Sequence, residues 1–363
     1  MNTLKVVHIV EALSAGIHSY LKDLARVFDT IDNVETTIIY SDKRKEIDAL
    51  KVREDFPEST KMIMVPMQRE IAPFADIKSY ALLKQKLKEI QPDVVHLHSS
   101  KAGVIGRIAA SALKPKPKIY YTPHGYSFLR KDVSPFTRSV YRTIEKSMQK
   151  LYGGVTIACG DTEFEYAKAL GSSRLVRNGV NFLKYEGVVK SDFKEKQQLT
   201  VGIVGRITAP RRPELFNRIA EANPQFNFVW VGDGELRDVL VAKNIKVSGW
   251  FYNSSDVLNC LKNIDIYIQT SAWEGLPIAL LEAMALKIPV LATNVVGNKD
   301  VIRSGENGYL FKDEKEASVI LKTLSDFEKR SEIGMNGYLT CKERFNSSKN
   351  FKNLAEVYQN APQ

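Results

Sequence analysis

The sequence predicts an α/β protein of two domains, each built on a doubly wound parallel sheet. The chain has 363 residues, enough for two domains of ordinary size. In both halves, short apolar runs rich in β-branched and aromatic residues alternate with helical segments. A charged stretch without clear periodicity, 182–198, separates the halves and is expected to be the linker. Ligands of such sheets bind beyond the carboxyl ends of the strands, so we expect functional residues in the loops that follow them.

The first domain is expected to span 1–182, with strands and helices in regular alternation. Its predicted strands are 6–10, 35–40, 62–65, 93–97, 118–121, 155–158 and 174–176. Its predicted helices are 18–28, 79–90, a helix that ends at 113, and 135–152.

The second domain is expected to span 199–363 and to repeat the same alternation. Its predicted strands are 199–204, 227–231, 245–247, 264–269, 289–293 and 308–311. Helical residues from 317 to 358 complete it, and we expect the last helix to pack back on the first domain.

Composition limits the class of protein. With 44% hydrophobic and 26% charged residues, the chain has the profile of a globular protein, and no apolar run is long enough for a membrane-spanning helix. The first residues lead directly into a strand and lack a signal-peptide pattern. Cys159, Cys260 and Cys341 are widely spaced, which argues against a disulfide framework and a zinc site. We expect a cytoplasmic protein.

The net charge of +10 belongs mainly to the first half of the chain. Residues 1–196 hold 32 Lys and Arg against 23 Asp and Glu, whereas residues 197–363 hold 20 against 19. Such a surface suits nucleic acid or an anionic membrane leaflet, and a basic residue near the leaflet contributes about 1 kcal/mol. Solubility alone is the simpler explanation.

Two glutamates eight positions apart, Glu274 and Glu282, mark the chemistry of the second domain. Gly275 supplies a turn after a predicted strand, and Pro277 suits the first helical position because its missing N–H would be unpaired there. The N-terminus of this helix offers N–H groups and a positive dipole to a phosphate. This pattern favours a sugar nucleotide, with one carboxylate for a ribose diol and the other for a sugar hydroxyl. A surface glutamate that complements the helix dipole is the structural alternative.

The loop 205–212, after the first strand of the second domain, is cationic. Arg206 and one of Arg211 and Arg212 can converge on a diphosphate, and a solvated basic loop is the structural alternative. A departing phosphate needs such stabilisation, because removing one preorganised donor typically costs about 3–4 kcal/mol. The sequence leaves open which of the two adjacent arginines takes part.

The histidines divide by position. His124 follows a strand and precedes a glycine, which places it at the ligand-binding edge, although a structural role is the alternative. His8 lies within a strand and is expected in the core. His96 and His98 can share one face, but we expect no metal site because third and fourth ligands are missing. His18 is a candidate for the acceptor side.

The run 274–285, Glu-Gly-Leu-Pro-Ile-Ala-Leu-Leu-Glu-Ala-Met-Ala, closely resembles the E-x7-E signature of family 4 glycosyltransferases, which are retaining enzymes of the GT-B fold. Further family-like segments are 11–16, 99–103, 122–125, 177–180, 205–212 and 293–298. The sequence departs from the family in two places. Ala15 replaces the first glycine of the N-terminal loop, so only Gly16 carries over, and Arg212 replaces the usual lysine.

The resemblance implies two Rossmann-like domains that face each other across a cleft, and a nucleoside-diphosphate sugar, most simply a UDP-sugar, as donor. It implies neither a metal nor another cofactor, and the absence of a D-x-D triplet agrees with this. The implied catalytic residues are His124, Glu274, Arg206 and Arg212. The implied donor-binding residues are Gly16, Arg206, Arg211, Arg212, Trp250, Glu274, Gly275, Leu276, Pro277 and Glu282.

The resemblance also implies retention without an enzyme nucleophile and an acceptor sugar, lipid-linked through a polyprenyl diphosphate, in bacterial surface polysaccharide synthesis. The acceptor-side candidates in the first domain are His18, Ser100, Lys101 and Tyr126. Helix 135–152 carries basic residues four apart on one face and follows an aromatic segment. A solvated charged face is the structural alternative, and the functional interpretation is a patch that binds the inner face of the cell membrane and brings the lipid-linked acceptor within reach. We expect no nucleic-acid partner.

Two other functions remain open at this point. One is a nucleotide-sugar 2-epimerase of the same fold, which needs no acceptor. The other is a non-catalytic partner that binds a sugar nucleotide within a glycan-assembly complex. The intact pair of glutamates disfavours both.

Overall fold

The computed structural model describes residues 3–11, 13, 15–43, 49–68, 72–186, 196–251 and 254–360. The chain forms two compact units, one of Met1–Asn178 with Ser347–Gln363 and the other of Gly179–Asn346. The second unit therefore begins earlier than 199 and ends before 363. Its early start has a packing reason, because Val180 bridges to Asn346 and the ring of Phe182 packs edge-on against Tyr338, 5.7 Å between centroids.

The first unit contains a parallel seven-stranded sheet with the order β3-β2-β1-β4-β5-β6-β7. Its strands are β1 (Leu4–Val10), β2 (Val34–Tyr40), β3 (Lys61–Met64), β4 (Val94–His98), β5 (Lys118–Thr122), β6 (Val155–Ala158) and β7 (Ser173–Leu175). Its helices are α1 (Ala15–Phe28), α2 (Ala49–Glu54), α3 (Pro73–Ile90), α4 (Ser99–Ser111), α5 (Pro135–Tyr152), α6 (Asp161–Leu170) and α13 (Ser347–Gln359). The strand order reverses between β1 and β4, which is where ligands of this topology bind.

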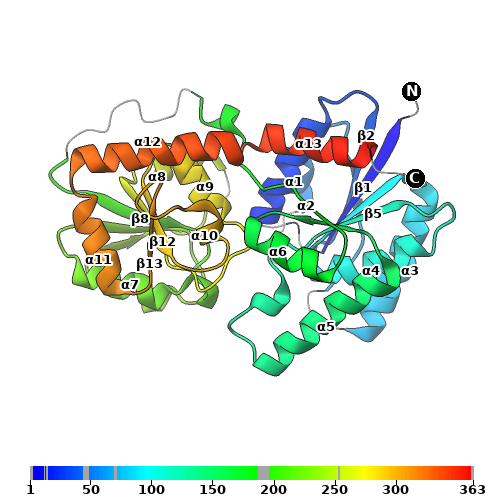
Figure 1. Ribbon diagram of the computed structural model, residues 1–363, viewed down its shortest axis with the longest axis horizontal. Helices are drawn as coiled ribbons and strands as arrows, with labels where there is room; N and C mark the ends of the chain where they lie inside the picture. The colour runs from blue at the N-terminus through cyan, green and yellow to red at the C-terminus, as the bar shows by residue number, and fades with distance from the viewer. Residues whose placement is uncertain are drawn as a thin grey trace. The chain divides into compact units, whose positions relative to one another are not determined.

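Alternate residues of the central strands face two apolar layers. Val7 and Ile9 of β1 pack with α3 and α4, whereas Val6 and Val10 pack with α1 and α13. Helix α13 comes from the end of the chain but lies beside α1, as Figure 1 shows in red and blue. Its side chains Phe351, Leu354, Ala355 and Tyr358 are buried in the core of the first unit.

The second unit contains a parallel six-stranded sheet with the order β10-β9-β8-β11-β12-β13. Its strands are β8 (Thr200–Val204), β9 (Asn227–Val231), β10 (Ile245–Val247), β11 (Ile266–Gln269), β12 (Val290–Thr293) and β13 (Tyr309–Phe311). Its helices are α7 (Pro213–Ala222), α8 (Ser254–Lys262), α9 (Ile278–Ala285), α10 (Asn298–Val301), α11 (Glu314–Thr323) and α12 (Phe327–Arg344). The order reverses between β8 and β11, the two strands that precede the predicted arginine and glutamate loops.

The prediction of two doubly wound parallel sheets is confirmed, and the differences are several element ends and two helices that the sequence analysis missed. Helix α1 begins at Ala15 rather than 18, so Gly16 lies in its first turn and not in a loop. Helix α3 begins at Pro73 rather than 79, with proline at its first position. Helix α9 begins at Ile278, and Pro277 caps it with a carbonyl that accepts the Leu281 N–H at 3.2 Å. Helices α2 and α6 were not predicted.

Within the described residues, no helix is both long enough and apolar enough to cross a lipid bilayer.

Candidate active site

Glu274 is the centre of the second unit's site. Its carboxylate lies in the loop after β11, and 16% of its side chain is exposed. The Oε1 atom accepts two hydrogen bonds, from Gln269 Nε2 at 2.7 Å and Ser271 Oγ at 2.6 Å, and it forms an ion pair with Arg211 Nη1 at 2.8 Å. No hydrogen bond to Oε2 is found among the described residues, so the recorded hydrogen bonds hold the carboxylate through one oxygen.

The groups that hold Glu274 are themselves fixed. Gln269 and Ser271 are fully buried at the end of β11. The Tyr267 hydroxyl donates to Gln269 Oε1 at 2.8 Å, and burial raises the pKa of that tyrosine, so the hydroxyl keeps its proton. Thr293 at the end of β12 donates to the Ser271 carbonyl at 2.5 Å. Such a network preorganises the carboxylate before any ligand arrives.

The structure distinguishes the two adjacent arginines. Arg211 pairs with Glu274, and its carbonyl accepts the Thr270 hydroxyl at 2.6 Å. Arg212 has a left-handed backbone, φ 52°, directly before α7, and its Nε lies 3.5 Å from Glu214 Oε1. Arg211 is therefore the arginine of the carboxylate centre, whereas Arg212 contacts the first turn of α7.

Three glycines bring the loops of the second unit together. A Cβ on Gly232 would lie 2.2 Å from the Gly205 carbonyl oxygen, and one on Gly234 would lie 2.4 Å from the Ile207 carbonyl oxygen. Gly297, with φ 85°, would place a Cβ 2.7 Å from the Glu274 Cβ. The Gly-Asp-Gly element thus serves the close approach of the loops after β8 and β9. Sequence reasoning missed Gly297, although it lies in the quoted segment 293–298.

The other predicted donor-binding residues are near this centre in sequence but differ in exposure. Arg206 in the loop after β8 and Glu282 on α9 are half-buried, as is Gly275. Leu276 is 7% exposed and Pro277 is buried, so both can offer a ligand little beyond their backbone. Trp250 is 53% exposed.

His124 is the centre of the first unit's candidate site and follows β5. Its backbone is left-handed, φ 53°, and so is that of Gly125, φ 95°. Glu163 of α6 accepts the Gly125 N–H at 2.7 Å and fixes this turn. The ring Nε2 lies 3.0 Å from His98 Nδ1, and the Tyr20 ring packs edge-on, 4.8 Å between centroids. Burial lowers the pKa of His124 to about 3, so the imidazole is neutral.

His124 belongs to a cluster of four histidines. His8 is on β1, and His96 and His98 are two positions apart on the adjacent strand β4, where His96 pairs with His8. All three side chains point to the face covered by α1 and α13 and are fully buried. His8 Nδ1 lies 2.9 Å from His98 Nε2, while His96 bonds Thr122 and the Tyr358 hydroxyl. Burial lowers the pKa of all three, that of His8 to about 3.

The sequence had indicated that a third metal ligand was missing beside His96 and His98. The structure corrects this, because ligand atoms of His8, His96 and His98 lie within 4.8 Å of one another. However, both ring nitrogens of His96 and both of His98 already take part in hydrogen bonds within the protein.

The predicted acceptor-side residues are mostly engaged with neighbours. His18 Nε2 lies 3.2 Å from Asp55 Oδ2. The Ser100 hydroxyl lies 2.9 Å from Ser127 Oγ, and Lys101 donates to both carboxylate oxygens of Asp76, at 2.6 and 2.7 Å. Tyr126 is only 2% exposed and stacks on Phe128, so its side chain lies in the core, and the acceptor role predicted for it stays a prediction.

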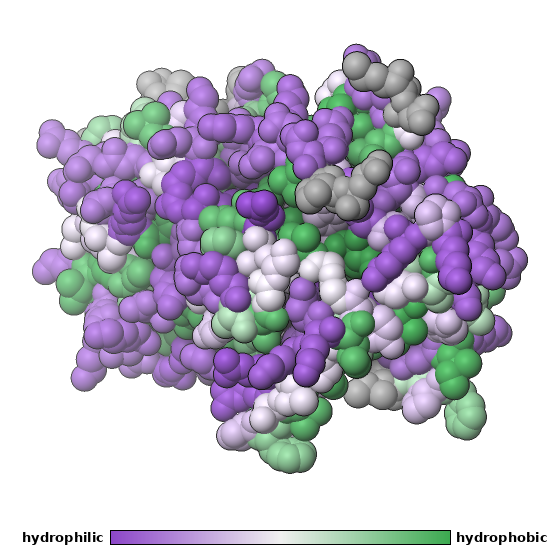
Figure 2. Space-filling view, turned by 45° about the vertical axis from the view of Figure 1, so that its right-hand side comes forward, coloured by the Kyte–Doolittle hydropathy of each residue, from purple (hydrophilic) through white to green (hydrophobic). Residues whose placement is uncertain are grey.

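Helix α5 presents a mixed basic and apolar surface. Arg142, Lys146 and Lys150 are exposed, and Arg138 is half-buried. Large apolar side chains on the same helix are also exposed, Phe136 at 79% and Leu151 at 70%. Figure 2 shows apolar side chains reaching the surface at the lower margin of the face in view.

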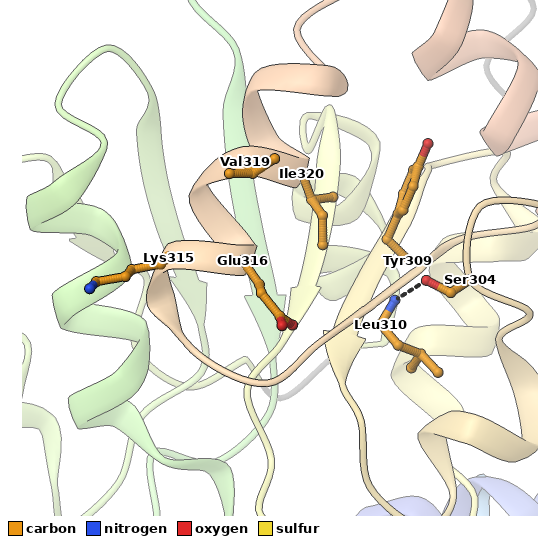
Figure 3. Close-up of a pocket in the computed structure, with 7 residues that line it drawn as sticks. All are labelled: Ser304, Tyr309, Leu310, Lys315, Glu316, Val319 and Ile320. Atoms are coloured by element: carbon orange, nitrogen blue, oxygen red, sulfur yellow. Dashed lines mark hydrogen bonds between the residues drawn. The ribbon is translucent and has the colours of Figure 1, made fainter.

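A pocket elsewhere in the second unit is separate from these residues. It has a volume of about 420 Å³ and lies between β13 and α11, with Tyr309, Ile320 and Val319 among its lining residues (Figure 3). No residue of the predicted site lines it.

Comparison with known proteins gives two family models that cover most of the chain. Glycosyltransferase Family 4 matches residues 14–182, and Glycosyl transferases group 1 matches residues 186–340. An Escherichia coli protein, UDP-Gal:alpha-D-GlcNAc-diphosphoundecaprenol alpha-1,3-galactosyltransferase, is 31% identical over 283 residues, 70% of this chain and 71% of the relative. The Staphylococcus aureus capsular polysaccharide biosynthesis glycosyltransferase CapM is 25% identical over 326 residues, 81% of this chain and 84% of the relative.

Among solved structures, Anabaena HepE in complex with UDP and glucose superposes with a TM-score of 0.78. It is 17% identical, and the match covers 99% of this chain and 100% of that chain. At 17% sequence identity, this similarity is evidence for a shared fold and not for a shared function.

Proposed function

We propose a specific reaction for this chain, which belongs to glycosyltransferase family 4, has the GT-B fold and serves surface polysaccharide synthesis. In this reaction the protein transfers a sugar, with retention, from a UDP-sugar to a lipid-linked acceptor. The observation that carries the proposal is the Arg211–Glu274 pair, at the strand-order reversal of the second unit. The Escherichia coli relative, a galactosyltransferase that uses UDP-Gal and a diphosphoundecaprenol-linked GlcNAc, supports both the donor and the acceptor class. The UDP held by HepE supports the nucleotide.

We propose that the two carboxylate oxygens of Glu274 have different partners when the donor binds. Oε2 accepts a hydroxyl of the donor sugar, while Oε1 stays bonded to the protein. Arg211 and Arg206 bind the diphosphate, and Glu282 binds the ribose. Arg211 takes the part that the resemblance had assigned to Arg212, because only Arg211 contacts Glu274. Trp250, with its exposed ring, suits a place near the base, and Gly16 stays the donor-binding candidate of the first unit.

In the proposed retaining reaction, the bond between the anomeric carbon and the phosphate oxygen breaks, and a bond to the acceptor oxygen forms on the same face. The acceptor's proton passes to the departing phosphate oxygen, so no enzyme nucleophile is needed. Arg206 and Arg211 stabilise the charge that develops on the diphosphate, which is the task a metal ion performs in other transferases. His124, neutral and at the sheet edge of the first unit, contacts the transferred sugar.

The acceptor side of the proposal rests on α5. Arg142, Lys146 and Lys150 supply positive charge for an anionic leaflet, and Phe136 supplies an apolar group that can enter it. A protein held at the cytoplasmic face in this way meets a polyprenyl-diphosphate-linked sugar in the plane of the membrane. Vesicles with and without anionic lipid test this, and Arg142→Glu with Lys146→Glu should abolish sedimentation with the anionic ones.

The first experiment is a thermal-shift panel of UDP-, GDP-, ADP- and dTDP-sugars on wild type and Glu282→Ala. A ligand at a hundredfold excess over its dissociation constant stabilises by about 2.7 kcal/mol, which such a panel resolves. We expect UDP-sugars alone to shift the wild type, with a smaller shift in the variant. A shift by another nucleotide would contradict the donor class.

Transfer is then assayed with the stabilising sugar and a synthetic polyprenyl-diphosphate sugar. The anomeric configuration of the product, read by NMR coupling constants, tests retention, and activity that persists in EDTA tests independence of a metal. Conversion of UDP-GlcNAc without any acceptor would support an epimerase instead. Unchanged cellular glycan synthesis after Glu274→Ala would support a non-catalytic binding partner.

A further inference from the structure

Three histidines of the first unit form one hydrogen-bonded row that ends at His124. His8 Nδ1 lies 2.9 Å from His98 Nε2, and His98 Nδ1 lies 3.0 Å from His124 Nε2. The residues come from β1, from the end of β4 and from the turn after β5, three neighbouring positions in the sheet. The proposed function uses only the last of them.

The row admits two arrangements of protons. Each ring is neutral, because burial lowers the pKa of all three, and therefore carries one N–H. Each of the two hydrogen bonds needs one proton between its nitrogens. If His98 is protonated at Nδ1, then His8 and His124 are also protonated at Nδ1. If His98 is protonated at Nε2, the other two rings are protonated at Nε2.

The far end of the row decides between the arrangements. His8 Nε2 is buried and has no hydrogen-bond partner among the described residues. The second arrangement would place an N–H there, and buried N–H groups without an acceptor are rare because they lose their bond to water. The first arrangement leaves only a lone pair at His8 Nε2 and puts the remaining N–H on His124 Nδ1. No hydrogen bond of that atom is found in the described part of the chain, and it is not among the buried polar atoms that lack a partner.

We propose that His8 and His98 are positioning residues that hold His124 in the Nδ1–H form, so that His124 offers a fixed N–H donor to an oxygen of the sugar nucleotide. This inference rests on the proposed transferase function for its purpose, although the row itself does not. It makes His124 a neutral hydrogen-bond donor and excludes it as the base that removes the acceptor's proton. A direct second support for the ring orientation is the edge-on packing of Tyr20 on His124.

The tautomers are measured by long-range ¹H–¹⁵N correlation on the full chain labelled at histidine, without any substrate. The sequence has five histidines, so each signal can be assigned from single His→Gln variants. We expect His8, His98 and His124 to show a protonated Nδ1 and an unprotonated Nε2. A protonated Nε2 on His124 in the wild type would overturn the proposal.

Two variants at His8 separate positioning from packing. His8→Asn keeps an amide N–H near the place of Nδ1, whereas His8→Leu removes the donor and keeps an apolar volume. We expect His8→Asn to preserve the His124 signal and to retain kcat. In His8→Leu an N–H on His98 Nε2 would lack an acceptor, so we expect the Nδ1–H form of His124 to persist and kcat to fall by less than about tenfold. If His8→Leu does not fold, the wild-type spectrum and His8→Asn still decide the question.

Elemental analysis of the purified protein, before and after added zinc, tests the competing use of this cluster. Bound zinc that alters the His8 and His98 signals would overturn the proposal, because those nitrogens would then bind a metal rather than each other. His8→Asp offers an acceptor to His98 Nε2 and should therefore move the His124 proton to Nε2 and lower kcat by about tenfold to a hundredfold, and an unchanged His124 tautomer in that variant would overturn the proposal as well. If the protein proves not to be a transferase, the histidine tautomers can still be as proposed. The NMR spectrum and the transfer assay therefore test the two hypotheses separately.

Discussion

The two units hold their candidate residues in opposite electrostatic ways. In the second unit, the Glu274 carboxylate and the Arg211 guanidinium form a charged pair in loops, and polar groups at the end of β11 hold it. In the first unit, neutral histidines lie inside the strands themselves, and burial keeps them uncharged. The same doubly wound sheet therefore supports an anion site in one unit and an uncharged hydrogen-bonding row in the other.

The difference follows from what each side chain needs. A charged pair needs partial exposure and several partners, because burying an ion is costly. A neutral imidazole can be buried completely, provided its nitrogens find partners. Charge removal should therefore impair the second unit's chemistry, whereas the first unit should respond to lost hydrogen bonds and to acid.

The largest expected effect comes from Arg211. Arg211→Met removes the cation that contacts Glu274, and we expect kcat to fall by a factor equivalent to about 3–4 kcal/mol. Arg212→Met is the matched control, because its guanidinium contacts Glu214, and its kcat should fall less than tenfold. Steady-state transfer assays measure both. Equal losses would show that the two arginines share the phosphates.

Gly297 offers a sharper test of loop geometry. Gly297→Ala adds a methyl group 2.7 Å from the Glu274 Cβ, so we expect donor affinity to weaken by more than tenfold. Gly305→Ala is the control, because Gly305 has nearly the same φ, 86°, and open space around it. Both variants should lose about 1–2 kcal/mol of stability from the left-handed backbone. Calorimetric titration with the UDP-sugar measures affinity, and a similar loss in both variants would contradict the contact argument.

Tyr358 tests the first unit through a lost hydrogen bond. Tyr358→Phe leaves His96 Nδ1 buried without its partner, and we expect a stability loss of about 1–3 kcal/mol in urea unfolding. Tyr338→Phe in the second unit is the control, since its hydroxyl shows no hydrogen bond in the described residues. Donor binding should be unchanged in both variants. A weakened donor affinity in Tyr358→Phe alone would link the histidine face to the donor.

Acid should destabilise the first unit through its buried histidines. The pKa of His8 is about 3 in the folded protein against 6.5 for an unburied histidine, so the unfolded chain binds more protons between these values. Above pH 6.5 His8 is neutral in both states and does not lower the free energy of unfolding. As the pH falls from 6.5 toward 3, only the unfolded chain takes up a proton at His8, so the free energy of unfolding decreases. His8→Asn should therefore reduce the slope of stability between pH 6 and 4 by about 1.4 kcal/mol per pH unit. Urea unfolding at several pH values measures this, and an unchanged slope would show that His8 is charged in the fold.

The sequence predicted the two parallel sheets well because strands and helices depend on local pattern. Glu274 follows a strand and precedes a helix, and that order alone places it at the carboxyl edge. The choice between Arg211 and Arg212 could not be made, because it depends on a left-handed φ at Arg212 that adjacent letters do not reveal.

The histidine row was beyond sequence reasoning for a different reason. His8 and His98 are separated by 90 positions, and their contact depends on the strand order that places β1 beside β4. The sequence placed His8 in the core and named Tyr126 as an acceptor-side candidate, but it could not show which helix covers either residue. Gly297 was overlooked because its neighbour, Glu274, comes from another loop.

Helix α13 has a consequence for biosynthesis. The core of the first unit includes Phe351, Leu354 and Tyr358, which leave the ribosome only after all of the second unit has been made. The nascent first unit must wait with the apolar groove beside α1 uncovered while some 170 further residues are translated, about 10–30 seconds at ordinary elongation rates. During that interval the unfinished unit is a natural client for a chaperone, and a stalled or truncated message yields an incomplete core rather than a working half.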